Sequence, residues 1–289
     1  MNYVFLDLEW NNAYCKKIHK NINEIIEIGA IKVLDNGKTQ VFDRIIKSQI
    51  TKRLGTRFKN LTNISNDIMR EGISFQKAVD DFLEFCGNDF ILITWSNSDL
   101  YAIAENFQVF LERDPSQYFS SYLDMQKYYQ SIYKSDNGNQ IALKSAAEKI
   151  GIDVGKLELH RASDDSKLTY MIFEKIKSLG DFRNIIVDTS KNNYFKRLLY
   201  RSFLIENINS PYLKHEDFIF ECPNCGEIVD PLKKWRCHNK QFTNIFECKK
   251  CKVKFIGRVR IRKYYDYTVA KRSVVTFDNK ASDKNNEHL

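Results

Sequence analysis

The chain has 289 residues, of which 43% are hydrophobic, and a formal net charge of +8. No apolar run reaches the roughly 18 residues that suggest a membrane helix, and the first residues lack a basic-then-apolar leader, so we expect a cytoplasmic protein without membrane span or signal peptide. A chain of this length favours one larger domain with a smaller module.

The positive charge is concentrated in the last third of the chain. Residues 181–289 contain 22 Lys and Arg against 13 Asp and Glu, whereas residues 1–180 contain 23 against 24. This asymmetry indicates either a polyanionic partner held by the C-terminal part or a basic surface that is only solvated.

The chain opens with two carboxylates in an apolar segment, FLDLEWN. Tyr3 to Leu6 form a short apolar run that predicts a buried strand. Asp7 and Glu9 stand two residues apart, so in a strand they share one face. Two like charges at the end of a buried strand are unfavourable unless a cation compensates them. Either the strand reaches solvent here, or the pair holds a divalent metal.

The following segments alternate between strand and helix patterns. Residues 24–47 contain two β-rich runs separated by Asp-Asn-Gly, which predicts a hairpin and, with the first strand, a three-stranded meander. A helix over 74–85, a strand over 90–95 and a helix from about Asp99 follow. Further helices are predicted over 143–150, 164–177 and about 193–207. Such α/β units gather functional sites at strand ends.

Two further acidic residues follow predicted secondary structure. Asp99 comes just after the buried strand, and Asp165 lies five residues after His160. Each has a structural alternative, because Asp99 could cap a helix, and Asp164 or Asp165 could favour the helix dipole from a first turn.

Together these motifs resemble the DEDD superfamily of 3′-to-5′ exonucleases, over about residues 1–180. The His160–Asp165 spacing is similar to the DEDDh subgroup, which includes ribonuclease T, oligoribonuclease and the proofreading subunit of bacterial replicative polymerase. The other subgroup has a tyrosine where this chain has Arg161. The run Glu27–Ala30 also looks like the family. The resemblance implies an α/β, ribonuclease H-like mixed sheet flanked by helices.

The resemblance also implies the chemistry. Two Mg²⁺ or Mn²⁺ ions about 3.5–4 Å apart can stabilise the attacking and leaving oxygens of a phosphoryl displacement. The expected ligands are Asp7, Glu9, Asp99 and Asp165, with His160 as general base. The expected reaction releases nucleoside 5′-monophosphates from a single strand with a free 3′ end.

The nature of the substrate has two alternatives. RNA is favoured because Trp95 to Asp99 is similar to the Trp-Gly-x-x-Asp motif of RNA-processing relatives, and single-stranded DNA is the other. Many relatives have Thr-Gly after the motif that corresponds to Asp7 and Glu9, where this chain has Asn11-Asn12 after Trp10. Trp10 either stacks on the last base or is structural. A non-catalytic nucleic-acid-binding protein on the same scaffold is a rival interpretation.

Five of the seven cysteines fall within residues 222–251, and the other two, Cys15 and Cys86, are expected to be ordinary thiols. Two Cys-x-x-Cys pairs separated by 22 residues resemble a zinc ribbon with one structural, tetrahedral Zn²⁺. The predicted ligands are Cys222, Cys225, Cys248 and Cys251. Cys237 and His238 are alternative ligands, and Lys252 stands where a glycine is usual.

A basic segment accompanies the ribbon. In a strand, Arg258, Arg260 and Arg262 share one face while Val259 and Ile261 share the other. With Lys233 and Lys234, these arginines are expected to contact nucleic acid. The ribbon could instead be purely structural or bind a protein partner. The expected division is an exonuclease domain over 1–180, a helical connector over 181–215, a zinc ribbon with its basic strand over 216–265, and a tail over 266–289 with a disordered end.

Overall fold

The computed structural model describes residues 2–133, 140–155, 157 and 160–277. The chain forms two compact units, Met1–Leu199 and Tyr200–Leu289. The expected connector over 181–215 is divided between them. Helix α8 (Tyr194–Leu199) buries Phe195 in the core of the first unit, whereas β7 (Phe203–Leu204) pairs with a strand of the second. Among the described residues, no helix is long and apolar enough to cross a membrane.

The first unit is built on a six-stranded mixed sheet in the order β3-β2-β1-β4-β5-β6. Its strands are β1 (Asn2–Cys15), β2 (Lys20–Val33), β3 (Thr39–Ile45), β4 (Phe90–Thr94), β5 (Ser121–Asp124) and β6 (Val187–Asp188). The predicted meander is confirmed, because β1, β2 and β3 pair antiparallel. Strand β4 joins the first residues of the longer β1 in parallel, and Ile93 near the carboxyl end of β4 pairs with Phe5, two residues before Asp7.

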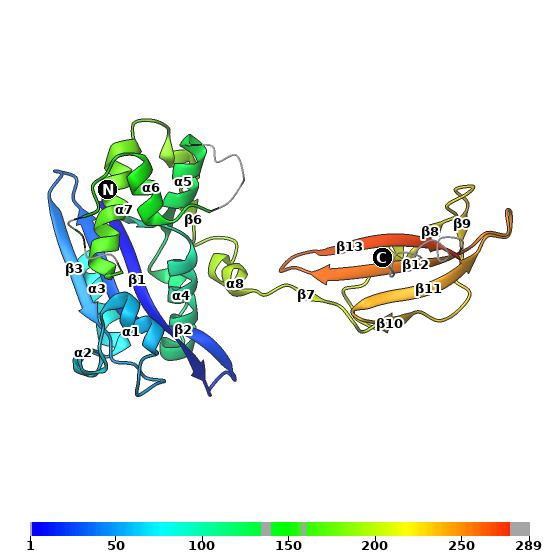
Figure 1. Ribbon diagram of the computed structural model, residues 1–289, viewed down its shortest axis with the longest axis horizontal. Helices are drawn as coiled ribbons and strands as arrows, with labels where there is room; N and C mark the ends of the chain where they lie inside the picture. Colours follow the sequence, from blue (N-terminus) through cyan, green and yellow to red (C-terminus); the bar gives the residue numbers. More distant parts are fainter. Residues whose placement is uncertain (1, 134–139, 156, 158–159, 278–289) are drawn as a thin grey trace, which may run out of the picture. The chain divides into compact units, whose positions relative to one another are not determined.

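Helices cover both faces of this sheet (Figure 1). They are α1 (Thr56–Thr62), α2 (Asn66–Glu71), α3 (Phe75–Cys86), α4 (Ser98–Asn106), α5 (Met125–Ile132), α6 (Leu143–Lys149), α7 (Ala162–Ile176) and α8, with a π-helical turn Phe107–Leu111 and 3-10 turns Pro115–Gln117 and Phe182–Ile185. The predicted helix over 193–207 is shorter than expected, since it ends at Leu199.

The two faces of β1 belong to different cores because side chains alternate along a strand. Val4, Leu6 and Leu8 pack with residues of α3 and α4. Phe5 faces α7 instead, and its ring centroid lies 5.4 Å from that of Phe173. Alternation therefore places the next residues of the Phe5 face, Asp7 and Glu9, on the side covered by α7.

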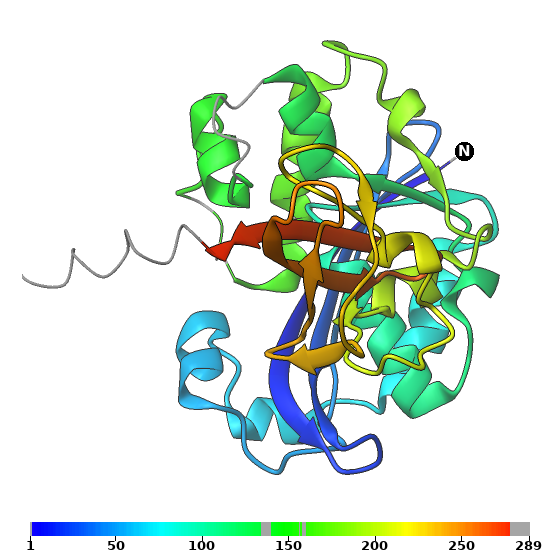
Figure 2. The same cartoon turned by 90° about the vertical axis from the view of Figure 1, so that its right-hand side faces the viewer.

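The second unit contains a sheet in the order β10-β11-β12-β13, with β7 also paired to β12. Its elements are β8 (Phe220–Glu221), β9 (Ile228–Val229), β10 (Arg236–His238), β11 (Gln241–Glu247), β12 (Lys254–Lys263), β13 (Thr268–Thr276) and a 3-10 turn His215–Phe218. Strands β12 and β13 run side by side as a long hairpin (Figures 1 and 2). The expected tail from residue 266 thus begins with a paired strand, and its predicted disorder from about residue 280 lies outside the described residues.

Candidate active site and zinc site

The carboxylates of the opening motif lie inside β1 rather than at its end. The strand continues to Cys15, past an irregularity between Glu9 and Trp10. Both Asp7 and Glu9 are only partly exposed. Asp7 pairs with Gly29 of β2, and Glu9 pairs with Glu27. The alternative in which the strand simply reaches solvent is therefore wrong.

Asp99 and Asp165 reach the same place from two helices. Asp99 lies in the first turn of α4 and is 4% exposed, beside the backbone of Leu8. The N-cap of α4 is Asn97, so Asp99 is not the cap. Asp165 lies in the first turn of α7, where its Oδ2 accepts a hydrogen bond of 3.2 Å from the backbone N–H of His160.

Potential ligand atoms of Glu9, His160 and Asp165 lie within 4.8 Å of one another. Among these residues, His160 is exposed and has a left-handed backbone with φ of 70°. The charges of Asp99 and Asp165 act on Asp7 as well, so the five predicted catalytic residues lie in one region, between the start of α7 and β1. The region contains both a buried group, Asp99, and an exposed group, His160, so the site is open to solvent on one side.

The electrostatics of this cluster favour binding of cations. Burial, and then the charges of Asp99, Asp165 and Glu9, raise the pKa of Asp7 well above its ordinary value. Burial and neighbouring carboxylates raise the pKa of Glu9 to about 8, and burial raises that of Asp99 to about 7. Burial also raises the pKa of Asp165. Crowded carboxylate oxygens are the hard ligands that Mg²⁺ and Mn²⁺ prefer, so the donor set fits the expected ions.

Gly29 explains how α7 comes so close to β1. A Cβ atom at this position would lie 2.1 Å from the carbonyl carbon of Ala162 and 2.1 Å from the nitrogen of Ser163. Only glycine allows the first turn of α7 to contact the sheet this closely. Because Gly29 pairs with Asp7, the contact places Asp165 next to the carboxylates of β1.

A buried ion pair that is not predicted from the sequence also fixes the start of α7. Glu27 is fully buried, and its Oε1 accepts hydrogen bonds from Arg161 Nε at 3.0 Å and Nη2 at 2.7 Å. The backbone N–H of Ala162 donates to Oε2 at 3.3 Å. Arg161 directly follows His160, so this ion pair holds the segment with His160 and Asp165 against β2. The sequence feature that could have indicated this ion pair is a glutamate within the apolar run of β2.

Two tryptophans near the motifs have structural surroundings. Trp10 is partly buried against the core that contains Leu6 and Leu8. Trp95 is 8% exposed, packs edge-on against Tyr129, and donates through Nε1 to the carbonyl oxygen of Ile141 at 3.1 Å. The packing of Trp10 against the core of Leu6 and Leu8 supports the structural alternative for Trp10.

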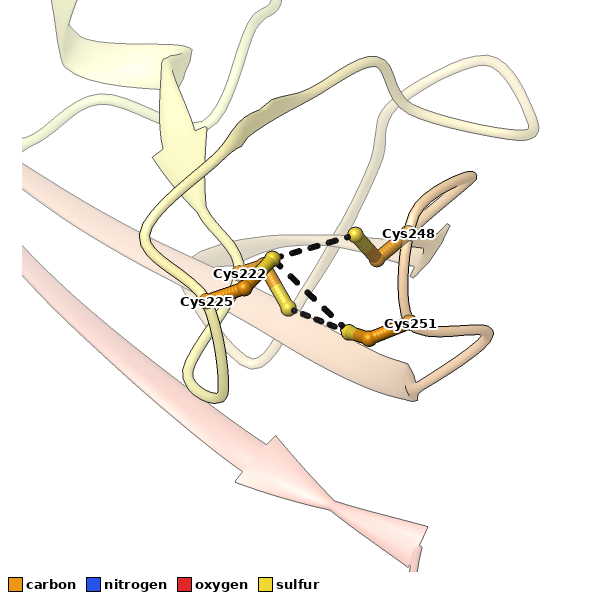
Figure 3. Close-up of side chains that lie close together, drawn as sticks. All are labelled: Cys222, Cys225, Cys248 and Cys251. Atoms are coloured by element: carbon orange, nitrogen blue, oxygen red, sulfur yellow. Dashed lines mark hydrogen bonds between the residues drawn. The ribbon is translucent and has the colours of Figure 1, made fainter.

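The second unit gathers four cysteines from two turns (Figure 3). The Sγ atoms of Cys222 and Cys251 lie 3.3 Å apart, those of Cys225 and Cys248 3.5 Å, and those of Cys225 and Cys251 3.8 Å. Four sulfurs about 2.3 Å from a central Zn²⁺ form a tetrahedron with edges of about 3.8 Å, so this spacing suits zinc. Among the described residues, Cys237 and His238 do not belong to this cluster.

The two cysteine turns have the same backbone design. The N–H of Gly226 donates to the carbonyl oxygen of Cys222, and the N–H of Lys252 donates to that of Cys248, both at 2.9 Å. Gly226 has φ of 74° and Lys252 has φ of 60°. The lysine that replaces the usual glycine therefore adopts the glycine conformation.

The basic residues of the ribbon are placed as follows. Val259 and Ile261 are buried, whereas Arg260 is exposed and Arg258 and Arg262 are partly exposed, so the predicted alternation of faces is confirmed. Lys233 and Lys234 are exposed in the segment before β10.

Comparison with known proteins agrees with the geometry of the first unit. A model of the RNase_T exonuclease family matches residues 4–173. Over 182 residues, the chain is 26% identical to a PolC-type DNA polymerase III of Thermotoga petrophila, which covers 62% of this chain and 12% of that protein. Over 155 residues it is 24% identical to the probable 3′-5′ exonuclease KapD of Bacillus subtilis, covering 53% of this chain and 73% of that protein.

Solved structures show the same fold. The nuclease domain of 3′hExo, a DEDDh family member bound to rAMP, aligns with a TM-score of 0.53 and 18% identity, over 62% of this chain and 92% of that one. Exonuclease I of E. coli in complex with a dA16 oligonucleotide aligns with a TM-score of 0.50 and 14% identity, over 85% of this chain and 54% of that one.

Proposed function

Because the chain belongs to the RNase_T exonuclease family, we propose that it is a DEDDh-type 3′-to-5′ exonuclease that releases nucleoside 5′-monophosphates from single-stranded nucleic acid. The convergence of acidic side chains from β1, α4 and α7 on one place carries this proposal. A non-catalytic scaffold would have no use for carboxylates whose mutual repulsion and burial are unfavourable.

Each residue of the cluster has a role in the proposed reaction. Asp7, Glu9, Asp99 and Asp165 would hold two Mg²⁺ or Mn²⁺ ions. When bound, such ions stabilise the charge on the attacking and leaving oxygens. His160, exposed beside Glu9 and Asp165, would take the proton from the attacking water. The ion pair of Glu27 with Arg161 would keep His160 in place.

We propose RNA as the preferred substrate, with single-stranded DNA as the second candidate. The similarity of Trp95 to Asp99 to the motif of RNA-processing relatives supports RNA, as does the likeness to a nuclease domain bound to rAMP. The likeness to exonuclease I bound to dA16 supports DNA.

Digestion of matched substrates tests the proposal. RNA and DNA of equal sequence, labelled at the 5′ end and carrying either a 3′ hydroxyl or a blocking 3′ group, are incubated with Mg²⁺ or Mn²⁺. We expect shortening from the 3′ end and mononucleotide products. Asp165→Asn should abolish hydrolysis, while the matched Asp164→Asn should retain it. Internal cleavage, or equal loss in both variants, would contradict the assignment.

The cysteine cluster would hold one structural zinc ion. The spacing of the four sulfurs supports this proposal, as does the small size of the unit, which benefits from a metal to stabilise its fold. Elemental analysis of the purified chain should find one zinc per molecule, and Cys248→Ser should lose it. A Cys237→Ser variant with the same loss would instead support the alternative ligand.

A further inference from the structure

The hairpin of β12 and β13 has one buried and one open face. Phe255, Val259 and Ile261 are buried in the core of the second unit. The alternate positions of β12 point the other way, and their strand partners share that side. Arg258 pairs with Ser273, Arg260 with Lys271 and Arg262 with Val269. We call the side formed by these six residues the open face.

The open face is joined by a residue from another strand. Thr243 of β11 pairs with Arg258, and exposed Arg236 of β10 pairs with Thr243. Directly paired residues lie on the same side of a sheet. Arg236 therefore adds a further positive charge to the side of the sheet that carries Arg258.

The charges of the open face are not neutralised. Within the part of the chain that the structure describes, the side chains of Arg258, Arg260 and Lys271 form no hydrogen bond or ion pair, and Arg262 Nη1 donates to Ser202 Oγ at 3.2 Å. Strands β12 and β13 contain no Asp or Glu. A surface that carries several cations outside any ion pair attracts polyanions.

Two stacked tyrosines end the open face. Tyr264 lies two residues beyond Arg262, and its backbone N–H donates to the carbonyl oxygen of Tyr267 at 2.8 Å. The two rings stack with centroids 4.9 Å apart and an interplanar angle of 18°. Tyr267 is 59% exposed. A stacked aromatic pair with one exposed and one partly exposed ring, which follows Arg262 in the chain, offers a platform on which a base can stack.

We propose that the open face binds single-stranded nucleic acid, with the arginines on successive phosphates and the tyrosine pair on a base; this inference rests on the proposed exonuclease function and names where its substrate is held. Arginines at alternate positions of a strand are about 6.6 Å apart, which suits an extended sugar-phosphate backbone. Stacking on the tyrosines requires an unpaired base, so the face fits a single strand better than a duplex.

Binding is measured in the full chain with Asp7→Asn, so that the probe stays intact. Fluorescence anisotropy with labelled oligouridylate and oligothymidylate of equal length gives Kd over a range of salt concentrations. Replacing Arg258 and Arg260 with Ala should reduce the log–log salt slope by about 1.4, which corresponds to about 25-fold weaker binding at about 0.1 M salt. Tyr264→Ala with Tyr267→Ala should weaken binding about fivefold or more with the slope unchanged.

The matched control removes two lysines from the same unit but away from the open face. Lys249→Ala with Lys250→Ala, in the second cysteine turn, should change the slope by much less. Zinc content and thermal unfolding verify that each variant is folded. If the arginine variant kept the parent affinity and slope for both probes, the open face would not bind nucleic acid. Because hydrolysis is not measured, this result is independent of the nuclease assay, and loss of nuclease activity alone would leave it unaffected.

Discussion

Replacing Gly29 with alanine tests how the catalytic cluster is assembled. The added Cβ would lie 2.1 Å from the carbonyl carbon of Ala162, whereas ordinary contacts begin at about 3.4 Å, so α7 must retreat by about 1.3 Å. Asp165 and the adjacent His160 would move with it. A displacement of about 1 Å can reduce a rate by about 10²-fold. We expect a loss of that size, with a decrease in the free energy of unfolding of about 1–3 kcal/mol.

The assay is single-turnover removal of the 3′-terminal nucleotide, together with thermal unfolding. The matched control is Gly180→Ala, because a Cβ there would meet its nearest neighbour, Cγ1 of Ile132, at 3.6 Å. The control should keep the wild-type rate. If Gly29→Ala also kept it, close contact of α7 with the sheet could not be what positions Asp165.

Three further predictions concern the two sites. Burial and neighbouring carboxylates raise the pKa of Glu9 to about 8, and burial raises that of Asp99 to about 7, so these groups hold protons more tightly in the folded state. Without divalent ions, Tm should therefore fall as pH rises from about 4 to about 8. Added Mg²⁺ should raise Tm more at about pH 8 than at about pH 4. A Tm that does not change with pH would refute the prediction. His160→Ala should slow hydrolysis by about 10²–10⁴-fold yet keep the Mg²⁺-induced increase in Tm, and an unchanged rate would exclude it as general base. Gly226→Ala should destabilise the zinc-loaded chain by about 1 kcal/mol, because alanine disfavours the left-handed backbone at this position. Lys252→Gly should stabilise the chain by less than that, because glycine relieves the left-handed backbone but loses more entropy on folding. Unfolding of both variants in denaturant measures the difference in stability.

Local patterns were sufficient for several features of the chain. Alternation along a strand predicted that Asp7 and Glu9 share a face, and that the arginines of residues 258–262 lie opposite buried aliphatic residues. The turn at Asp-Asn-Gly and the helix over 74–85 are also predicted from the sequence, the helix within one residue, because turn and helix signals act over a few residues; strand β2 begins four residues before the predicted segment. The spacing of the Cys-x-x-Cys pairs likewise anticipated the cluster of four sulfurs.

Other features depend on contacts between distant residues, which no local period encodes. Glu27 and Arg161 are 134 positions apart, and only the packing of α7 on β2 makes them an ion pair. The same packing makes Gly29 necessary, although its sequence context is that of any strand glycine. The sequence after residue 266 predicts a tail because it is polar and only weakly alternating; it forms a strand because β12 supplies the hydrogen bonds. The division of the connector was decided by which core buries Phe195, since a short amphipathic segment can pack on either side until a tertiary contact selects one.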